Sequence, residues 1–303
     1  MLLDRGLALC SGKGGVGKSS LAANVAATAA TMGWRTLLLD LDPQGNLGSD
    51  LGYVQAGMSD EGQALLDAVH RGRPLVPLPE VRPGLDVVPA GPLTEECFAR
   101  LQEAARREGY WAYRPLGEAL RSVRGAYDLV VLDTPPSASA TLEAVMCHVR
   151  FLLIPARFDG GSIDGLVHVA DRYDAVRSSG ANPFLELLGV VLFGFGVNEA
   201  RMRRDCRTEL TETLDGSALV FETVVRDARK AARHMRRHGV VASEYWEAAR
   251  LAPAWYDAER GAETFAPNAA PLSQDYWSLT SEILAALIAR LGAGRSSVME
   301  AAS

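Results

Sequence analysis

Short runs of apolar residues alternate along this chain with longer segments in which apolar residues recur at helical spacing. One such segment follows residue 19 and places Leu21, Val25 and Ala29 on one face. The alternation predicts a doubly wound α/β fold, in which a mostly parallel sheet is flanked by helices. We expect the strands near residues 6–10, 35–40, 85–89, 127–133, 150–155, 185–193 and 219–225.

A glycine-rich loop joins the first predicted strand to the first predicted helix. Residues 12–20 read Gly-Lys-Gly-Gly-Val-Gly-Lys-Ser-Ser and contain the pattern G-x-x-x-x-G-K-[ST]. Backbone N–H groups of such a loop curl around phosphate oxygens, and the helix N-terminus favours negative charge. In phosphoryl transfer Lys18 would neutralise the phosphates and Ser19 would bind Mg²⁺. The predicted nucleotide-binding residues are Gly12, Lys13, Gly14, Gly15, Val16, Gly17, Lys18, Ser19 and Ser20.

Two later strands end in carboxylates. The run 35–46 carries Asp40 and Asp42 before a proline, and the run 127–133 ends at Asp133 before Thr-Pro-Pro-Ser. In open α/β sheets, ligands bind at the carboxyl ends of the strands. Asp133 is therefore the predicted acid on the Mg²⁺ side, acting through a bound water. Asp40 has two interpretations, a further metal ligand or a strand-end acid that only supports the metal or the loop.

Three motifs now carry a family resemblance. Lys-Gly-Gly-Val-Gly-Lys-Ser, Asp-Leu-Asp-Pro-Gln-Gly-Asn and Asp-Thr-Pro-Pro-Ser occur in this order and resemble the deviant Walker A, A′ and B motifs of the ParA/Soj partition ATPases. The resemblance continues through the apolar runs near 151–155, 188–192 and 220–224, to about residue 240. MinD proteins share the phosphate-binding loop but lack the second and third motifs. Nitrogenase iron proteins need cysteine ligands, whereas the cysteines here are scattered.

The resemblance implies a P-loop ATPase that uses ATP and Mg²⁺. Within this family the equivalent of Lys13 reaches across a face-to-face homodimer to the partner's nucleotide, and the A′ aspartate, here Asp42, orients or polarises the attacking water. The implied catalytic residues are Lys13, Lys18 and Asp42. Activity in the family is slow and is stimulated by a ParB-type protein. The family's Pro-Arg-Asn turn near adenine is replaced here by Arg226-Asp-Ala, which leaves the adenine contacts open.

Basic residues cluster in two places although the chain has a formal net charge of −6. The first cluster recurs at three- and four-residue steps, which would form one stripe on a helix, and Asp227 is the only acid among its residues. Such clusters predict binding to the phosphates of double-stranded DNA without sequence preference, although a solvated helix face is an alternative. The second cluster consists of Arg201, Arg203, Arg204 and Arg207. The predicted DNA-binding residues are Arg226, Arg229, Lys230, Arg233, Arg236 and Arg237 of the first cluster, with Arg201, Arg203 and Arg204 of the second.

The remaining features favour a cytoplasmic, nucleoid-associated protein. The four cysteines form no C-x-x-C pair or disulfide framework, and no apolar stretch is long enough for a membrane span. A helix over 276–291 should pack its apolar face, which includes Ile283 and Ile288, into the core rather than onto a membrane. We expect one domain over 1–303, with an excursion at about 246–274 that is atypical of the family.

Three functions fit these observations. The first is a chromosome or plasmid partition ATPase that dimerises around ATP, binds DNA without sequence preference and is stimulated by a ParB-type partner. A second is a similar ATPase that positions another cargo. A third class comprises a MinD-like membrane-associated regulator and a metabolic P-loop enzyme.

Overall fold

A computed structural model describes residues 2–136, 140–157, 162–196, 199–252 and 265–300, with only the backbone described at 162–167 and 294–300. Nine strands in these ranges form one sheet with the order β3-β4-β2-β5-β1-β6-β7-β8, and β9 lies beside β7. Every pair is parallel except β3 with β4. The strands are β1 (Leu3–Leu9), β2 (Thr36–Asp40), β3 (Leu78–Arg82), β4 (Leu85–Val88), β5 (Leu129–Asp133), β6 (Val149–Ala156), β7 (Glu186–Phe195), β8 (Leu219–Val220) and β9 (Val225–Arg226).

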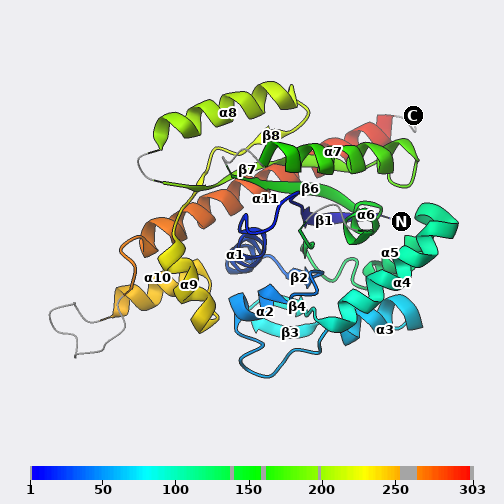
Figure 1. Cartoon of the computed structure of the whole chain (residues 1–303), viewed down its shortest axis with the longest axis horizontal. Helices are drawn as coiled ribbons and strands as arrows, with labels where there is room; N and C mark the ends of the chain where they lie inside the picture. The colour runs from blue at the N-terminus through cyan, green and yellow to red at the C-terminus, as the bar shows by residue number, and fades with distance from the viewer. Residues whose placement is uncertain (1, 137–139, 158–161, 197–198, 253–264, 301–303) are drawn as a thin grey trace.

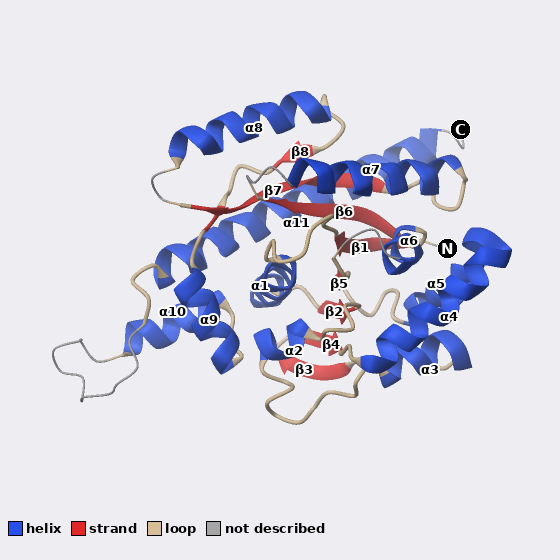
Figure 2. Cartoon of the chain, viewed as in Figure 1, coloured by secondary structure: helices blue, strands red, loops and turns tan. Residues whose placement is uncertain are grey.

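Helices cover both faces of the sheet, and the buried side chains form one apolar core on each face (Figures 1 and 2). One face carries α3 (Gln63–Arg71), α4 (Pro92–Glu108), a 3₁₀ helix (Gly109–Tyr113), α5 (Arg114–Ser122), α6 (Ala140–Met146), α7 (Ser162–Ser178) and α8 (Ala200–Leu214). The other carries α1 (Lys18–Thr31), α2 (Asn46–Leu51), α9 (Arg229–His238), α10 (Ala242–Leu251) and α11 (Ala269–Glu300). The predicted doubly wound α/β class is confirmed.

The sequence-based strand predictions are correct for the central sheet and incomplete at its edges. Strand β3 was not predicted, because its five residues are partly exposed and lack a regular alternation of apolar and polar side chains. The segment 219–225 forms two short strands, β8 and β9, rather than one, and both pair with β7. The chain between them turns away from the sheet and is held from two sides.

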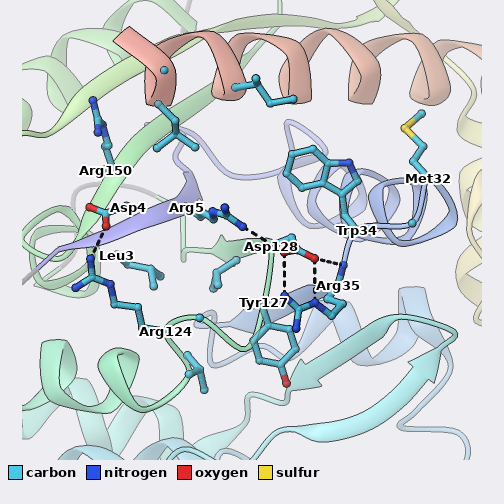
Figure 3. A pocket seen from close by; sticks show the side chains of 17 residues that line it. Leu3, Asp4, Arg5, Met32, Trp34, Arg35, Arg124, Tyr127, Asp128 and Arg150 are labelled. Carbon is cyan, nitrogen blue, oxygen red and sulfur yellow. Dashed lines mark hydrogen bonds and ion pairs between the residues drawn. The ribbon is translucent and has the colours of Figure 1, made fainter. Parts of the chain in front are cut away.

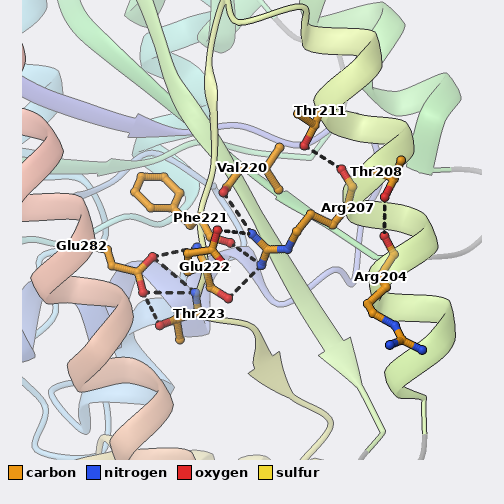
Figure 4. Close-up of polar contacts among 9 residues, drawn as sticks. All are labelled: Arg204, Arg207, Thr208, Thr211, Val220, Phe221, Glu222, Thr223 and Glu282. Atoms are coloured by element: carbon orange, nitrogen blue, oxygen red, sulfur yellow. Dashed lines mark hydrogen bonds and ion pairs between the residues drawn. The ribbon is translucent and has the colours of Figure 1, made fainter.

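Two charged side chains hold this turn (Figure 4). Arg207 of α8 donates hydrogen bonds to the carbonyl oxygens of Val220, Phe221 and Glu222 at 3.3, 2.8 and 2.8 Å. From the other side, the Glu282 carboxylate of α11 accepts hydrogen bonds from the backbone N–H groups of Glu222 and Thr223. Arg207 and Glu282 therefore satisfy backbone groups that sheet pairing leaves open.

A second polar junction fixes α9 and α10 against the rest of the fold. Arg82 of β3 donates to the carbonyl oxygens of Leu51 and Gly239, both at 2.8 Å, and pairs with Glu244 at 2.8 Å. These bonds join β3 to the ends of α2 and α9 and to the start of α10. The two backbones at the ends of α2 and α9 pack so closely that a Cβ on Gly239 would lie 2.3 Å from the Cα of Gly52.

The C-terminal helix is longer than predicted, since α11 runs from Ala269 to Glu300. Its predicted apolar face is buried at Leu279, Ile283 and Leu287, but Ile288 is 56% exposed, so the prediction is wrong at that residue. Residues 253–264 of the expected excursion lie outside the described part of the chain. The four cysteines are buried free thiols. No helix among the described residues is long and apolar enough to cross a membrane.

Replacing Gly239 with Ala should destabilise the protein by about 2–4 kcal/mol. The residue has a φ of +62°, which disfavours a side chain, and the added methyl group would strike the backbone of Gly52. Urea unfolding of the variant measures this loss. Gly57→Ala is the matched control, because Gly57 has a φ of +69° and nothing lies within 4 Å of the position that its methyl group would take. Equal losses in both variants would show that the close contact between α2 and α9 contributes nothing.

Candidate nucleotide-binding site

The glycine-rich loop runs from the end of β1 at Leu9 to the first residue of α1 at Lys18. Gly15 and Gly17 have φ values of +76° and +88°, a region that glycine adopts without steric cost. A side chain at Gly17 would also clash with β7, because a Cβ there would lie 2.4 Å from the ring of Phe193. The loop therefore curls tightly and leads directly into a helix N-terminus, the arrangement that binds phosphate.

Lys18 and Asp133 form a buried ion pair beneath this loop. The Lys18 Nζ and Asp133 Oδ1 atoms are 2.5 Å apart, and the two side chains are 6% and 0% exposed. Burying one such charge without the other costs several kcal/mol, so each charge offsets the cost of burying its partner. Ser19 lies next to them, with its hydroxyl in hydrogen-bonding reach of Asp133.

Asp40 lies beside this pair because β2 and β5 run in parallel register, with Asp40 opposite Asp133. Its Oδ1 accepts a hydrogen bond from the Asp42 N–H at 3.1 Å. Burial and the negative charge of Asp133 raise the pKa of Asp40 well above its usual range. Among the described residues, Asp40 Oδ2 and Asp133 Oδ2 are buried without a hydrogen-bond partner.

These two oxygens have no hydrogen-bond partner and are therefore available as ligands for a metal ion. Mg²⁺ prefers oxygen ligands and commonly binds through one or two carboxylates together with phosphate oxygens and waters. The hydroxyl of Ser19 and the carboxylates of Asp133 and Asp40 supply oxygen atoms of this kind at one strand edge. The residues present therefore fit Mg²⁺.

Asp42 and Lys13 lie in the two loops at this edge. Asp42 is 5% exposed, and its Oδ1 accepts a hydrogen bond from the Gln44 N–H at 3.1 Å. Lys13 is exposed, and its carbonyl oxygen accepts a hydrogen bond from the Ser11 hydroxyl at 3.0 Å. The loop after β5, which carries the Thr-Pro-Pro-Ser motif, lies against the phosphate-binding loop, because a Cβ on Gly14 would lie 3.7 Å from Pro136. Ser137 of that motif lies outside the described residues.

The structure adds Asp50, which the sequence did not single out. Its buried carboxylate on α2 accepts a hydrogen bond from the Ser20 hydroxyl at 3.0 Å and pairs with Arg236 of α9 at 2.6 Å. On the same side, Asn24 of α1 accepts a hydrogen bond from the Ala242 N–H at 2.8 Å. Polar bonds therefore connect α1, which begins at the phosphate-binding loop, with α2, α9 and α10. No local pattern identified Asp50, because its partners are distant in sequence.

The predicted basic stripe is real on α9 but shorter than expected. Arg226 lies on β9 instead, where Asp275 of α11 holds its guanidinium at 2.6 Å and also accepts its backbone N–H. Arg236 is held by Asp50, so acids from other elements neutralise two of the six predicted positions. The exposed basic residues of α9 otherwise lie opposite its buried Ala231 and Met235, and are Arg229, Lys230, Arg233 and Arg237. Arg229 also pairs with Asp227 at 3.0 Å.

The second predicted cluster divides in a similar way. Arg201, Arg203 and Arg204 are exposed on α8. Arg201 lies 3.8 Å from Asp205, a weak surface pair. Arg207, on the inner side of the same helix, holds the turn between β8 and β9. Three of the four arginines are therefore open to solvent.

This fold and loop define a P-loop nucleotide-binding protein. The family model described as an AAA domain matches residues 5–187. The chromosome partitioning protein ParA of Caulobacter vibrioides is 35% identical over 62% of this chain and 68% of its own length. ParA of Myxococcus xanthus is 32% identical over 74% of this chain and 75% of its own. The chain belongs to the ParA/Soj family of ATPases.

Solved structures agree on the fold. A McdA protein from Cyanothece in complex with ATP has a TM-score of 0.70 at 17% identity, covering 94% of this chain and 98% of its own. A cobyrinic acid a,c-diamide synthase from Mycobacterium smegmatis, with a bound ATP analogue and magnesium, has a TM-score of 0.59 at 23% identity, covering 83% and 99%. At these identities the likeness concerns the fold alone.

Replacing Asp40 with Asn should stabilise the nucleotide-free protein at pH 7. Since the pKa of Asp40 is raised in the folded state, the unfolded chain loses this proton first, near pH 4, and the free energy of unfolding falls as the pH rises from there through the folded pKa. The gain should be about 1.4 kcal/mol for each unit of elevation. Urea unfolding between pH 4 and pH 8 measures it.

Asp205→Asn on the exposed face of α8 is the control and should leave this pH dependence unchanged. A different result would contradict the raised pKa of Asp40. In that case Asp40→Asn would lower the free energy of unfolding at pH 7, and this free energy would change with pH in the same way in the variant and in the unmodified protein.

Proposed function

We propose that this protein is a DNA partition ATPase that dimerises around ATP, binds double-stranded DNA without sequence preference and hydrolyses ATP on stimulation by a ParB-type partner. The observation that carries the proposal is an exposed second lysine, Lys13, in a phosphate-binding loop that stands over the buried Lys18, Asp40 and Asp133. The family relationship supports the ATPase activity. Slow turnover, nucleoid association and the partner are parts of the proposal.

The chemistry follows from the positions of the charges. Lys18 would neutralise the β- and γ-phosphates, and Ser19 and Asp133 would hold Mg²⁺, directly and through water, with Asp40 as a further candidate ligand. When bound, the metal would offset the negative charge that develops on the phosphates. Asp42 is positioned by the Gln44 N–H beside this cluster and would orient or polarise the attacking water. A buried and preorganised site strengthens each of these electrostatic effects.

Lys13 connects this chemistry with dimerisation. Lys18 is directed inward to Asp133, whereas Lys13 lies on the exposed part of the same loop. An exposed lysine here is placed to contact a nucleotide held by a second copy of the chain that faces the loop. Two protomers related in this way would each complete the other's site, so ATP would control assembly.

DNA binding would use the exposed basic residues of α9 and α8. Arg229, Lys230, Arg233 and Arg237 leave their guanidinium or ammonium groups on the solvent side of α9. Contacts of this kind bind the phosphate backbone and carry no sequence information. Dimerisation would double the number of contacts, and affinity should fall steeply as salt rises.

The contacts of Asp50 offer a route from nucleotide to DNA. The Asp50 carboxylate accepts hydrogen bonds from both Ser20 and Arg236. Ser20 follows the residue that would bind Mg²⁺, and Arg236 lies on the helix that would bind DNA. A shift of Ser20 on nucleotide binding would change the position of α9 through this shared acid. An ATPase that positions a cargo other than DNA could use the same contacts of Asp50, so these contacts support both functions.

The Asp42→Ala protein should bind duplex DNA only when ATP is present and only as a dimer. Loss of the water-orienting carboxylate should slow hydrolysis by about a hundredfold or more, which would hold the ATP-bound dimer together. Binding to a random-sequence duplex at about 50 and 200 mM salt, with mass followed by light scattering, measures both properties. ADP and nucleotide-free samples provide the comparison.

Lys13→Ala is the matched variant for this experiment. It should bind ATP but remain monomeric, because the lysine would act on the partner's nucleotide. An ATP-bound Asp42→Ala dimer that ignores DNA would contradict the DNA part of the proposal and favour the membrane-associated or metabolic alternatives. Hydrolysis at an undiminished rate by Asp42→Ala would remove this aspartate from the mechanism.

Charge reversal of Arg229, Lys230 and Arg233 to Glu should weaken DNA binding by about a hundredfold or more while ATP-dependent dimerisation stays intact. The reason is that these side chains are exposed on the solvent side of α9, where a change of charge should leave the packing of the domain intact. Filter binding at low salt, together with light scattering, measures the two effects separately.

The control carries a similar charge change elsewhere. Arg106→Glu with Arg107→Glu alters two exposed arginines of α4, on the opposite face of the sheet, and should leave DNA binding within about twofold. Equal loss in both variants would show that net charge, rather than the surface of α9, determines binding.

A further inference from the structure

A large opening lies at the amino ends of the central strands. This trough has a volume of about 1290 Å³ and is lined by the start of β1, the turn between α1 and β2, the loop before β5 and residues 288–292 of α11 (Figure 3). The seven residues of β1 span about 20 Å at the usual rise per residue, so the trough is separated from the phosphate-binding loop by the length of the sheet. A ligand bound in the trough would therefore not block the nucleotide-binding site at the carboxyl ends of the strands.

One wall of the trough is apolar. Ile288 and Leu291 of α11 face it together with Met32 and Trp34 of the turn before β2. Ile288 is 56% exposed, whereas Leu284 and Leu287 of the same helix are buried. Figure 3 shows Trp34 between α11 and Asp128, so that its indole ring and the helix border the same space. Apolar groups that are partly or fully exposed around one opening are typical of surfaces that bind another molecule.

The other wall is cationic. Four arginines and two aspartates line the trough. Arg150 is paired with Glu186 of β7 at 2.9 Å, which leaves an excess of one positive charge in a chain whose net charge is −6. Arg5 and Arg35 share Asp128, at 3.2 and 3.0 Å, and Arg124 pairs with Asp4 at 2.6 Å. In the described part of the chain, the side chains of Arg5 and Arg124 each donate one hydrogen bond. A guanidinium has five donors, so both retain capacity for a carboxylate ligand.

The volume of the trough and the charges that line it indicate which kind of ligand it would bind. Sites for single small molecules usually enclose roughly 300–1,000 Å³, and this trough is larger. Asp4 and Asp128 would repel a continuous polyanion, for which the exposed face of α9 is better suited. An extended chain that carries both acidic and apolar side chains would match the two walls at once.

We propose that this trough is a docking site for an acidic, apolar peptide segment of a partner protein. Carboxylates of the segment would pair with Arg5 and Arg124, and its apolar side chains would pack on Ile288 and Trp34. Binding at this end of the sheet would let the protein hold a partner while the opposite end binds nucleotide.

Fluorescence anisotropy with short labelled synthetic peptides tests the proposal on the full chain. One peptide alternates Asp or Glu with Leu or Phe, a second replaces its acids with Lys, and a third replaces its apolar residues with Ser. Only the first should bind. Ile288→Asp, and separately Arg5→Ala with Arg124→Ala, should each weaken its binding by about tenfold.

Matched variants separate docking from misfolding. Val76→Asp places a new acid at another exposed apolar residue, and Arg106→Ala with Arg107→Ala removes two arginines elsewhere, so both should bind the peptide normally. All variants should bind ATP as the unmodified protein does, which makes failure here distinguishable from failure of the ATPase proposal.

Three results would overturn the docking proposal. The first is no binding of the acidic, apolar peptide. The second is equal binding by the Val76→Asp and Ile288→Asp proteins. The third is that Ile288→Asp abolishes either self-association or binding to vesicles of anionic phospholipid while peptide binding is unchanged, which would assign the trough to a second copy of the chain or to a membrane surface.

Discussion

The buried ion pair between Lys18 and Asp133 is the interaction around which the nucleotide edge is built. Its two charges come from different elements, the first residue of α1 and the last residue of β5, and neither is exposed enough to be stabilised by water. Each is tolerated only because the other lies 2.5 Å away. The strand order must therefore place β5 directly beside β1, and the sheet has this order. A helix that packed elsewhere would leave one charge buried without a partner.

The same constraint explains Asp40. Parallel register between β2 and β5 brings its carboxylate next to Asp133, where a second negative charge is unfavourable. Burial is the main reason why the pKa of Asp40 is raised, and the charge of Asp133 adds to it. A divalent cation reverses this balance, because it is attracted to both carboxylates. A site that is electrostatically strained without a cation is therefore suited to bind one, and the cost falls on the stability of the nucleotide-free protein.

The sequence predicted what depends on short-range pattern. Apolar runs located the central strands, and the spacing of Lys13, Lys18 and Ser19 located the phosphate-binding loop, because glycine and helix-start signals are local. It did not predict that Asp275 would hold Arg226 or that Asp50 would hold Arg236, since these acids lie 49 and 186 residues from their partners. Counting charges within one helix missed them. The packing of Phe193 on Gly17 is hidden for the same reason.

The two ends of the sheet thus differ in how they treat charge. At the carboxyl ends, Lys18 and Asp133 are buried and paired, so their geometry is fixed in advance and suited to a reaction whose charges must be met at defined positions. At the amino ends, the arginines are mostly exposed and share their aspartates, as in the pair of Arg5 and Arg35 on Asp128. Exposed pairs contribute little to stability and are readily exchanged for a new partner. If both proposals hold, ionic pairs serve catalysis where water is excluded and recognition where it is not.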